Sequence, residues 1–133
     1  MRFMLLQDYG GVPADVPPMT AWTPEDIKAH IDFQRSLNAD LAERGELVDA
    51  QALTAPELAR FVVSDGASAP VVTDGPYPEA KELLAGYRMV DVESPERAVE
   101  IAAAASAAPG PGGTPIRQRI EVREVMGPVG TGE

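Results

Sequence analysis

Apolar positions along this chain fall into short extended runs and into two longer stretches with helical spacing. Apolar or β-branched runs predict strands at residues 2–9, 46–53, 61–63, 71–73, 87–92 and 118–126. A helical stripe between residues 24 and 44 is formed by Ile27, Ile31, Leu37 and Leu41. A second stripe, before residue 109, is formed by Ala98, Val99, Ile101, Ala102 and Ala105. The predicted order is therefore β-α-β-β-β-α-β, with one extra strand allowed for the hairpin formed by residues 61–63 and 71–73.

The start of each predicted helix carries the same signal. Thr23 and Ser94 are suitable N-caps, and each is followed by a proline and an acidic residue in the first turn. Gly45 suits the C-terminal cap of the first helix. Residues 109–113 contain two prolines and three glycines, which should end the second helix and form a flexible link.

Three polar residues lie within or beside the apolar stripe of the first helix. His30, Gln34 and Asn38 follow one another at intervals of four residues. Polar side chains on an inward helix face need partners there. They are expected either to bond to the sheet beneath the helix or to face a cavity.

This order of elements predicts an α+β, ferredoxin-like sandwich, in which two helices cover one face of an antiparallel sheet. Strands 2–9 and 87–92 are apolar on both faces, whereas residues 118–126 alternate and should lie near an edge. The second face of the sheet therefore needs a cover, and an identical sheet in a symmetric homodimer supplies one. Residues 1–126 should form one domain, followed by a flexible tail at 127–133.

Composition excludes several classes of function. The formal charge of −10 disfavours nucleic-acid binding, and the lack of cysteine excludes disulfides and thiolate chemistry. No apolar run is long enough to span a membrane, and Asp8 interrupts the N-terminal apolar run too early for a signal peptide. A cytoplasmic location is expected. Phosphate-binding loops and zinc-ligand spacing are also missing, so no cofactor and no metal is expected.

The segment from Val71 to Tyr87 combines a strand, an Asp-Gly-Pro turn, a charged loop and a second strand. Its residues Thr73-Asp74-Gly75-Pro76-Tyr77, Glu79, Lys81-Glu82, Gly86-Tyr87 and Val90-Asp91 resemble the signature of the DGPF-domain proteins. These are part of the YCII-related family, in the dimeric α+β barrel superfamily; the family usually has Phe at the position of Tyr77. The resemblance runs from the first strand to the last and implies this fold and a homodimer.

The resemblance also implies an active-site pair of a histidine and an aspartate, which correspond here to His30 and Asp74. His30 is the only histidine, and a lone histidine on a helix is often structural or solvated. Asp74 before a glycine is equally suited to turn formation. In the functional interpretation, the Asp74 carboxylate orients the His30 imidazole and fixes its tautomer.

Five further residues are candidates for contact with a small-molecule ligand, each with a structural alternative. They are Tyr77, Glu79, Lys81, Tyr87 and Trp22. The two tyrosines are equally suited to packing, the charged pair to a solvated loop, and Trp22 to a hydrophobic staple at the helix start. In the binding interpretation, Lys81 holds an anionic group and Trp22 forms a lid.

Two functions fit these residues. The first is a homodimeric enzyme without cofactor, in which His30 and Asp74 perform acid–base chemistry of the lyase, isomerase or elimination type. The second is a non-catalytic metabolite-binding or regulatory module, associated, as the resemblance to DGPF proteins implies, with an extracytoplasmic-function sigma factor. A solvent-accessible cavity shared by His30 and Asp74 would favour the enzyme.

Overall fold

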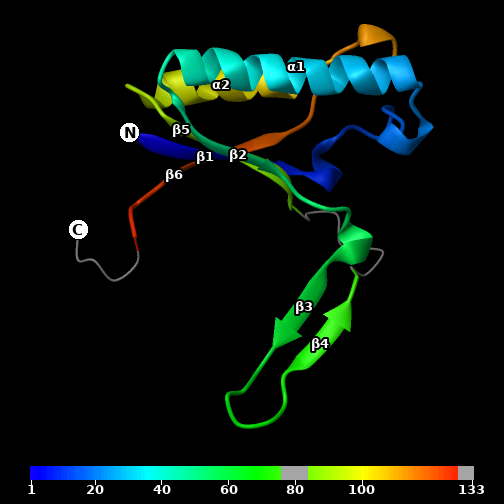
Figure 1. The fold of residues 1–133 in the computed structure, drawn as a ribbon, viewed down its shortest axis with the longest axis vertical. Coiled ribbons are helices and arrows are strands. Elements are labelled where there is room, and N and C mark those ends of the chain that lie inside the picture. The colour runs from blue at the N-terminus through cyan, green and yellow to red at the C-terminus, as the bar shows by residue number, and fades with distance from the viewer. Residues whose placement is uncertain (76–83, 129–133) are drawn as a thin grey trace.

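The computed structural model describes residues 1–75 and 84–128 as a four-stranded sheet, two helices and a separate hairpin (Figure 1). All strand pairs in the main sheet are antiparallel, and their order is β2-β5-β1-β6. Its strands are β1 (Arg2–Asp8), β2 (Leu47–Ala52), β5 (Leu84–Asp91) and β6 (Ile120–Glu124). The helices are α1 (Pro24–Glu43) and α2 (Pro95–Ser106), and the hairpin joins β3 (Arg60–Val63) to β4 (Val71–Asp74). This confirms the ferredoxin-like α+β prediction for a single chain, whose sheet is open rather than a closed barrel.

The ends of the helices are formed by the residues that the sequence indicates. The hydroxyl groups of Thr23 and Ser94 accept hydrogen bonds of 3.2 Å from the backbone N–H groups three residues later. Gly45 takes a φ of +73°, and Glu46 N–H donates to the Leu41 carbonyl, which closes a Schellman motif. Cap chemistry is local, so the sequence predicts it well.

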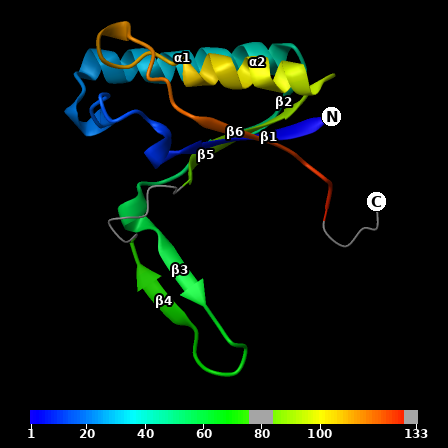
Figure 2. The same cartoon turned by 180° about the vertical axis from the view of Figure 1, so that it is seen from behind.

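The core lies between the sheet and the two helices. Phe3, Leu5 and Val90 from the sheet are at most 5% exposed, and they pack with Leu41 of α1 and Ile101 of α2. Small residues on α2 (Ala98, Ala102 and Ala105) are buried and allow that helix to lie close to β1 and β6. Both helices cover the same face of the sheet (Figures 1 and 2).

Two apolar residues from the predicted helical stripes, and Met126 at the end of the last predicted strand, lie at the surface. Ile31 is 40% exposed, Val99 is 57% exposed and Met126 is 96% exposed. For Ile31, the reason is that the inward stripe of α1 runs through His30, Gln34, Leu37 and Leu41, one residue away. Met126 lies beyond the end of β6, where no neighbouring strand or helix covers it.

Neither α1 nor α2 covers the second face of the sheet, which we call the open face (Figure 2). Met4 and Leu6 of β1 lie there with Tyr87 and Met89 of β5, and all four are half-buried. The expectation that β1 and β5 are apolar on both faces is therefore confirmed. The prediction that β6 lies at an edge is also confirmed, and its Ile120 and Val122 pack on the core.

The hairpin of β3 and β4, which we call the hairpin arm, extends away from the sheet on the side opposite the helices (Figure 1). Every residue of both strands is exposed, although most are apolar. Val62, Val63 and Val71 are 62%, 70% and 64% exposed. An isolated two-stranded hairpin is only marginally stable in water, so this arm has no core of its own.

The glycine- and proline-rich segment after α2 is a hydrogen-bonded turn rather than the flexible link that was expected. Gly110 N–H donates to the Thr114 carbonyl and Ile116 N–H donates to the Ala108 carbonyl. The turn returns the chain to β6 and lies beside α1. Within residues 1–75 and 84–128, no helix has the length and hydropathy required to cross a membrane.

Candidate functional site

Two of the three polar residues of α1, Gln34 and Asn38, bond to Arg88, the next residue along β5 after Tyr87. Arg88 is on the helix-covered face and is only 4% exposed. Its Nε donates to Asn38 Oδ1 over 2.7 Å, and its Nη2 donates to Gln34 Oε1. Of the two alternatives for these residues, bonding to the sheet holds for Gln34 and Asn38. The sheet provides the partner through a side chain rather than through its backbone.

The same series of hydrogen bonds continues to His30. The second polar atom of the Gln34 amide, Nε2, lies 3.3 Å from His30 Nε2, and His30 Nδ1 lies 2.9 Å from the Pro109 carbonyl oxygen. A carbonyl only accepts, so Nδ1 carries the proton and Nε2 accepts from Gln34. The donors therefore follow one direction, from Arg88 through Gln34 and His30 to Pro109.

Trp22 lies against His30 on the side of the loop that precedes α1. The two rings are 5.5 Å apart and meet edge to face, and Trp22 Nε1 donates to the Pro17 carbonyl over 2.8 Å. The indole is half-buried and lies near Gly110 of the turn after α2. The loop before α1 and the turn after α2 thus hold His30 from two sides.

Asp74 lies at the base of the hairpin arm, where its side chain is 87% exposed and forms an ion pair of 3.9 Å with Arg60. The following residue, Gly75, has a φ of +70°, as the Asp-Gly-Pro turn predicts, and its N–H donates to the Ala59 carbonyl. Among the described residues no hydrogen bond or ion pair joins Asp74 to His30. One chain therefore places these residues on different elements, and the His30–Asp74 pair stays a prediction.

Tyr87 lies on the open face, on the opposite side of β5 from Arg88. Its hydroxyl donates to Asp49 Oδ2 over 2.7 Å, and Gln51 Nε2 donates to the other carboxylate oxygen over 3.0 Å. The bond from Tyr87 is the main reason that the pKa of Asp49 is lowered, and the same bond raises the pKa of Tyr87. Tyr77, Glu79 and Lys81, the other ligand candidates in this region, lie outside the described residues.

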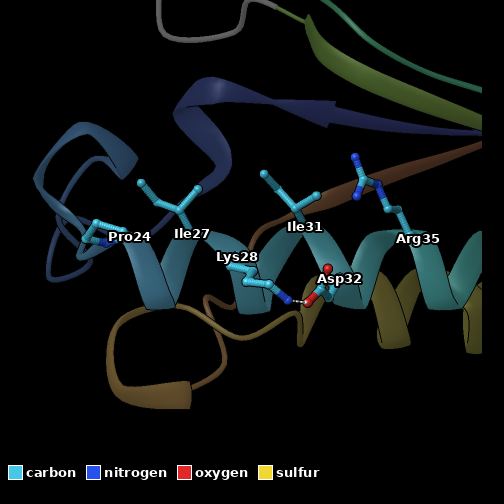
Figure 3. A pocket seen from close by; sticks show the side chains of 6 residues that line it. All are labelled: Pro24, Ile27, Lys28, Ile31, Asp32 and Arg35. Carbon is cyan, nitrogen blue, oxygen red and sulfur yellow. Dashed lines mark hydrogen bonds and ion pairs between the residues drawn. The ribbon is translucent and has the colours of Figure 1, made fainter.

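A shallow groove of about 410 Å³ runs along the N-terminal half of α1 (Figure 3). Ile27, Ile31 and Arg35 point from the helix towards the side where the strands lie, and Lys28 forms an ion pair of 2.6 Å with Asp32 at the rim. His30 and Arg88 do not line this groove. The groove and the polar series therefore lie on adjacent faces of the same helix.

Arg88 is the polar residue of this site that sequence reasoning missed. The alternation in residues 87–92 places it on the same face as Val90 and Val92, where arginine is rarely buried without a partner. One imidazole and two amides at four-residue spacing on the helix above were the complementary signal. In the described part of the chain, no cluster of histidine and acidic residues could hold a metal ion.

Comparison with known proteins agrees with this architecture. The family model of the YCII-related domain matches residues 1–118. No curated protein matches the chain.

Proposed function

Because the chain belongs to the YCII-related domain family, we propose that it is a homodimeric protein that binds a small organic molecule beneath α1 and transfers a proton through His30. The observation that carries this proposal is the directed hydrogen-bond series from buried Arg88 through Gln34 to His30. A surface histidine has no need of such a series. The chemistry proposed is of the lyase, isomerase or elimination type.

The proposed role of His30 as a base is supported by the different contacts of its two nitrogens. Nδ1 is held at 2.9 Å by the Pro109 carbonyl, which fixes the ring and its tautomer. Nε2 carries the lone pair and has only a 3.3 Å contact with the Gln34 amide. A substrate that displaces this amide meets an oriented base, the arrangement required for proton abstraction. Asp74 remains part of the proposal as a second group that acts on the ring.

The proposed homodimer is supported by two apolar surfaces on one side of the chain. The open face exposes parts of Met4, Leu6 and Met89, and the hairpin arm extends on the same side of the sheet. Exposed apolar patches of this kind are typical of protein interfaces. The partner that the resemblance implies is a second copy, whose sheet covers the open face. A cytoplasmic site of action belongs to the same proposal.

A non-catalytic regulatory module is the second candidate function, and the exposed hairpin arm favours it. Val62, Val63 and Val71 are well suited to contact another protein, such as a sigma factor. This candidate predicts that substitution of His30 leaves function unchanged, whereas substitution in the hairpin arm abolishes it.

The experiment that tests the catalytic proposal uses the single histidine as a reporter. We expect one or more members of a panel of small carboxylic acids and enones to shift the ring resonances of His30 saturably in the full chain. His30→Gln should fold and dimerise but show no turnover of the compound that binds. Glu43→Gln, an exposed change at the C-terminal end of α1, is the control and should retain turnover.

A panel compound that is turned over equally by His30→Gln and the wild-type protein would contradict the proposal. So would a His30 ring whose ¹⁵N shifts report the Nε2–H tautomer, because the hydrogen-bond series requires the proton on Nδ1.

A further inference from the structure

Within residues 1–75 and 84–128, Arg88 is a buried cation without a carboxylate partner. It occupies the helix-covered face of β5, with Val90 two residues later and Leu5 opposite on β1, and both neighbours are part of the apolar core. Its contacts are the amide oxygens of Gln34 and Asn38, which are neutral. Among the described residues no acidic side chain forms an ion pair with it. Burial consequently lowers the pKa of Arg88, and no carboxylate opposes this effect.

The lack of an acidic partner is unusual in this chain. It carries 21 acidic and 11 basic residues, so acidic residues are abundant. A buried guanidinium normally has a carboxylate, because an uncompensated buried charge is costly. Asn38 accepts from Arg88 at 2.7 Å, and an aspartate of the same shape at that position would neutralise it. The sequence instead places an amide there.

The guanidinium also keeps hydrogen-bonding capacity. Arginine has five N–H donors, of which Asn38 and Gln34 each accept one, so three remain. No fully buried side-chain nitrogen or oxygen in the described part of the chain lacks a partner. Nη1, which makes neither of these two hydrogen bonds, is therefore not fully buried and keeps a path to solvent, and through it to a ligand.

The residues of the sheet beside Arg88 on the β2 side are small. Ala50 of β2 is opposite Arg88, and Ala52 is opposite Gly86, two residues earlier on β5. Ala50, Ala52 and Gly86 lie on the helix-covered face, and none of them has a side chain larger than a methyl group. Ala52 is exposed on the edge strand β2, so the helix-covered face reaches solvent at this edge of the sheet.

We propose that Arg88 is the binding site for the carboxylate group of a small organic monoanion, held beneath α1 with the rest of the molecule directed towards His30. This inference rests on the proposed function and names its substrate class. The planar guanidinium matches a carboxylate in shape and presents paired donors. A single cation in a protein of charge −10 is suited to a monoanion and repels polyphosphates. Only the Gln34 amide separates Arg88 from His30 Nε2, so a bound carboxylate brings its neighbouring carbon atoms to the base.

Propionate and its neutral isostere propionamide test this inference in the wild-type protein, at constant ionic strength with sodium chloride. We expect propionate to shift the Arg88 Nε–H resonance and the His30 ring resonances saturably. Propionamide should have no such effect. The Arg88 resonance is identified by its disappearance in Arg88→Lys.

The decisive variant is Asn38→Asp, which gives Arg88 an internal carboxylate of unchanged shape. It should weaken propionate binding by at least about tenfold, because the new carboxylate competes for the guanidinium. Gln51→Glu adds the same charge on the open face and is the matched control, which should bind propionate as the wild-type protein does.

The outcomes separate this inference from the proposed function. Equal propionate affinity in Asn38→Asp and Gln51→Glu would overturn the role of Arg88 while leaving the role of His30 intact. Turnover of neutral panel compounds, with no saturable propionate shift, would do the same. Propionate binding that is lost in Asn38→Asp, together with undiminished turnover in His30→Gln, would support the anion site and contradict the proposed base.

Discussion

The β1–β5 pair and the β3–β4 hairpin arm are both antiparallel and both rich in apolar residues, yet only the first pair belongs to a core. Leu5 and Val90 are 2% and 0% exposed, whereas Val62 and Val63 are 62% and 70% exposed. The difference arises from the helices. Two capped helices with apolar stripes lie over the first pair, and none lies over the second (Figure 1).

This comparison shows that an apolar strand pattern predicts that the strand will be buried, but does not predict which part of the protein, or which partner, will cover it. The main sheet meets the requirement for burial within the chain on one face. The hairpin arm and the open face do not, and both lie on the side of the sheet away from the helices (Figure 2). The stability of the first region is therefore intrinsic to one chain, and the order of the second region is expected to depend on a partner.

The largest expected difference is between truncations in the two regions. Leu41→Ala removes a side chain that is 1% exposed and should lower the free energy of unfolding by about 2–5 kcal/mol at any protein concentration. Val62→Ala should change only the part of the stability that depends on protein concentration. Urea denaturation at two protein concentrations measures both. Equal, concentration-independent losses would contradict the division between the regions.

Substitution of the arm surface should dissociate the dimer. Val62 is opposite Val72, so Val62→Asp with Val72→Lys removes apolar surface but retains an attractive cross-strand pair. We expect the dimer dissociation constant to rise by about a hundredfold, roughly 2.7 kcal/mol, in sedimentation equilibrium. Val99→Asp, on the solvent side of α2, is the control and should remain dimeric. A double variant as dimeric as this control would place the interface elsewhere.

Each region also has an ion pair, and the two pairs should differ in how much they contribute to the free energy of unfolding. Arg97 donates to both oxygens of Glu46 over 2.9 and 2.8 Å in a half-buried site, so Glu46→Gln should cost about 1–3 kcal/mol at pH 7. Arg60 and Asp74 are 3.9 Å apart and exposed, so Asp74→Asn should change the free energy of unfolding by no more than about 0.5 kcal/mol.

The sign of the pH dependence follows from the Arg97 hydrogen bond, which lowers the pKa of Glu46 below its usual 4.5. The stabilisation is complete above the unfolded pKa and is lost as the pH falls through the lower folded pKa. The difference in the free energy of unfolding between Glu46→Gln and the wild-type protein should therefore disappear in acid. A difference that is constant from pH 7 to strongly acidic conditions would contradict the pairing.

The smallest expected difference concerns two glycines with the same backbone conformation. Gly45 after α1 and Gly75 after β4 have φ values of +73° and +70°, and neither has an atom close enough to obstruct a methyl group. Gly45→Ala should cost about 1 kcal/mol of global stability. The same change at Gly75 should alter amide exchange in the hairpin arm and leave global unfolding unchanged. Equal effects on global unfolding would show that the arm unfolds together with the sheet.

Local signals were the most reliable part of the sequence. The caps at Thr23, Ser94 and Gly45 and the positive φ of Gly75 depend on contacts within a few residues, and all were predictable. The helical stripe was less reliable. Ile31 fits the apolar period but is exposed, because the helix turns Gln34 inward to Arg88 and His30 inward to Gln34.

The sequence by itself determined the order of elements, their capped ends, the open apolar face and the membership of a family with this fold. Periodicity and cap chemistry act over short distances and can therefore be read from neighbouring residues. Only the tertiary structure decided which polar residues meet. His30, Gln34 and Asn38 are separated from Arg88 by at least one strand and a hairpin, and Pro109 follows a second helix. Their contacts depend on how α1 is rotated over the sheet, and that rotation is set by the packing of Leu41, Ile101 and Val90 together.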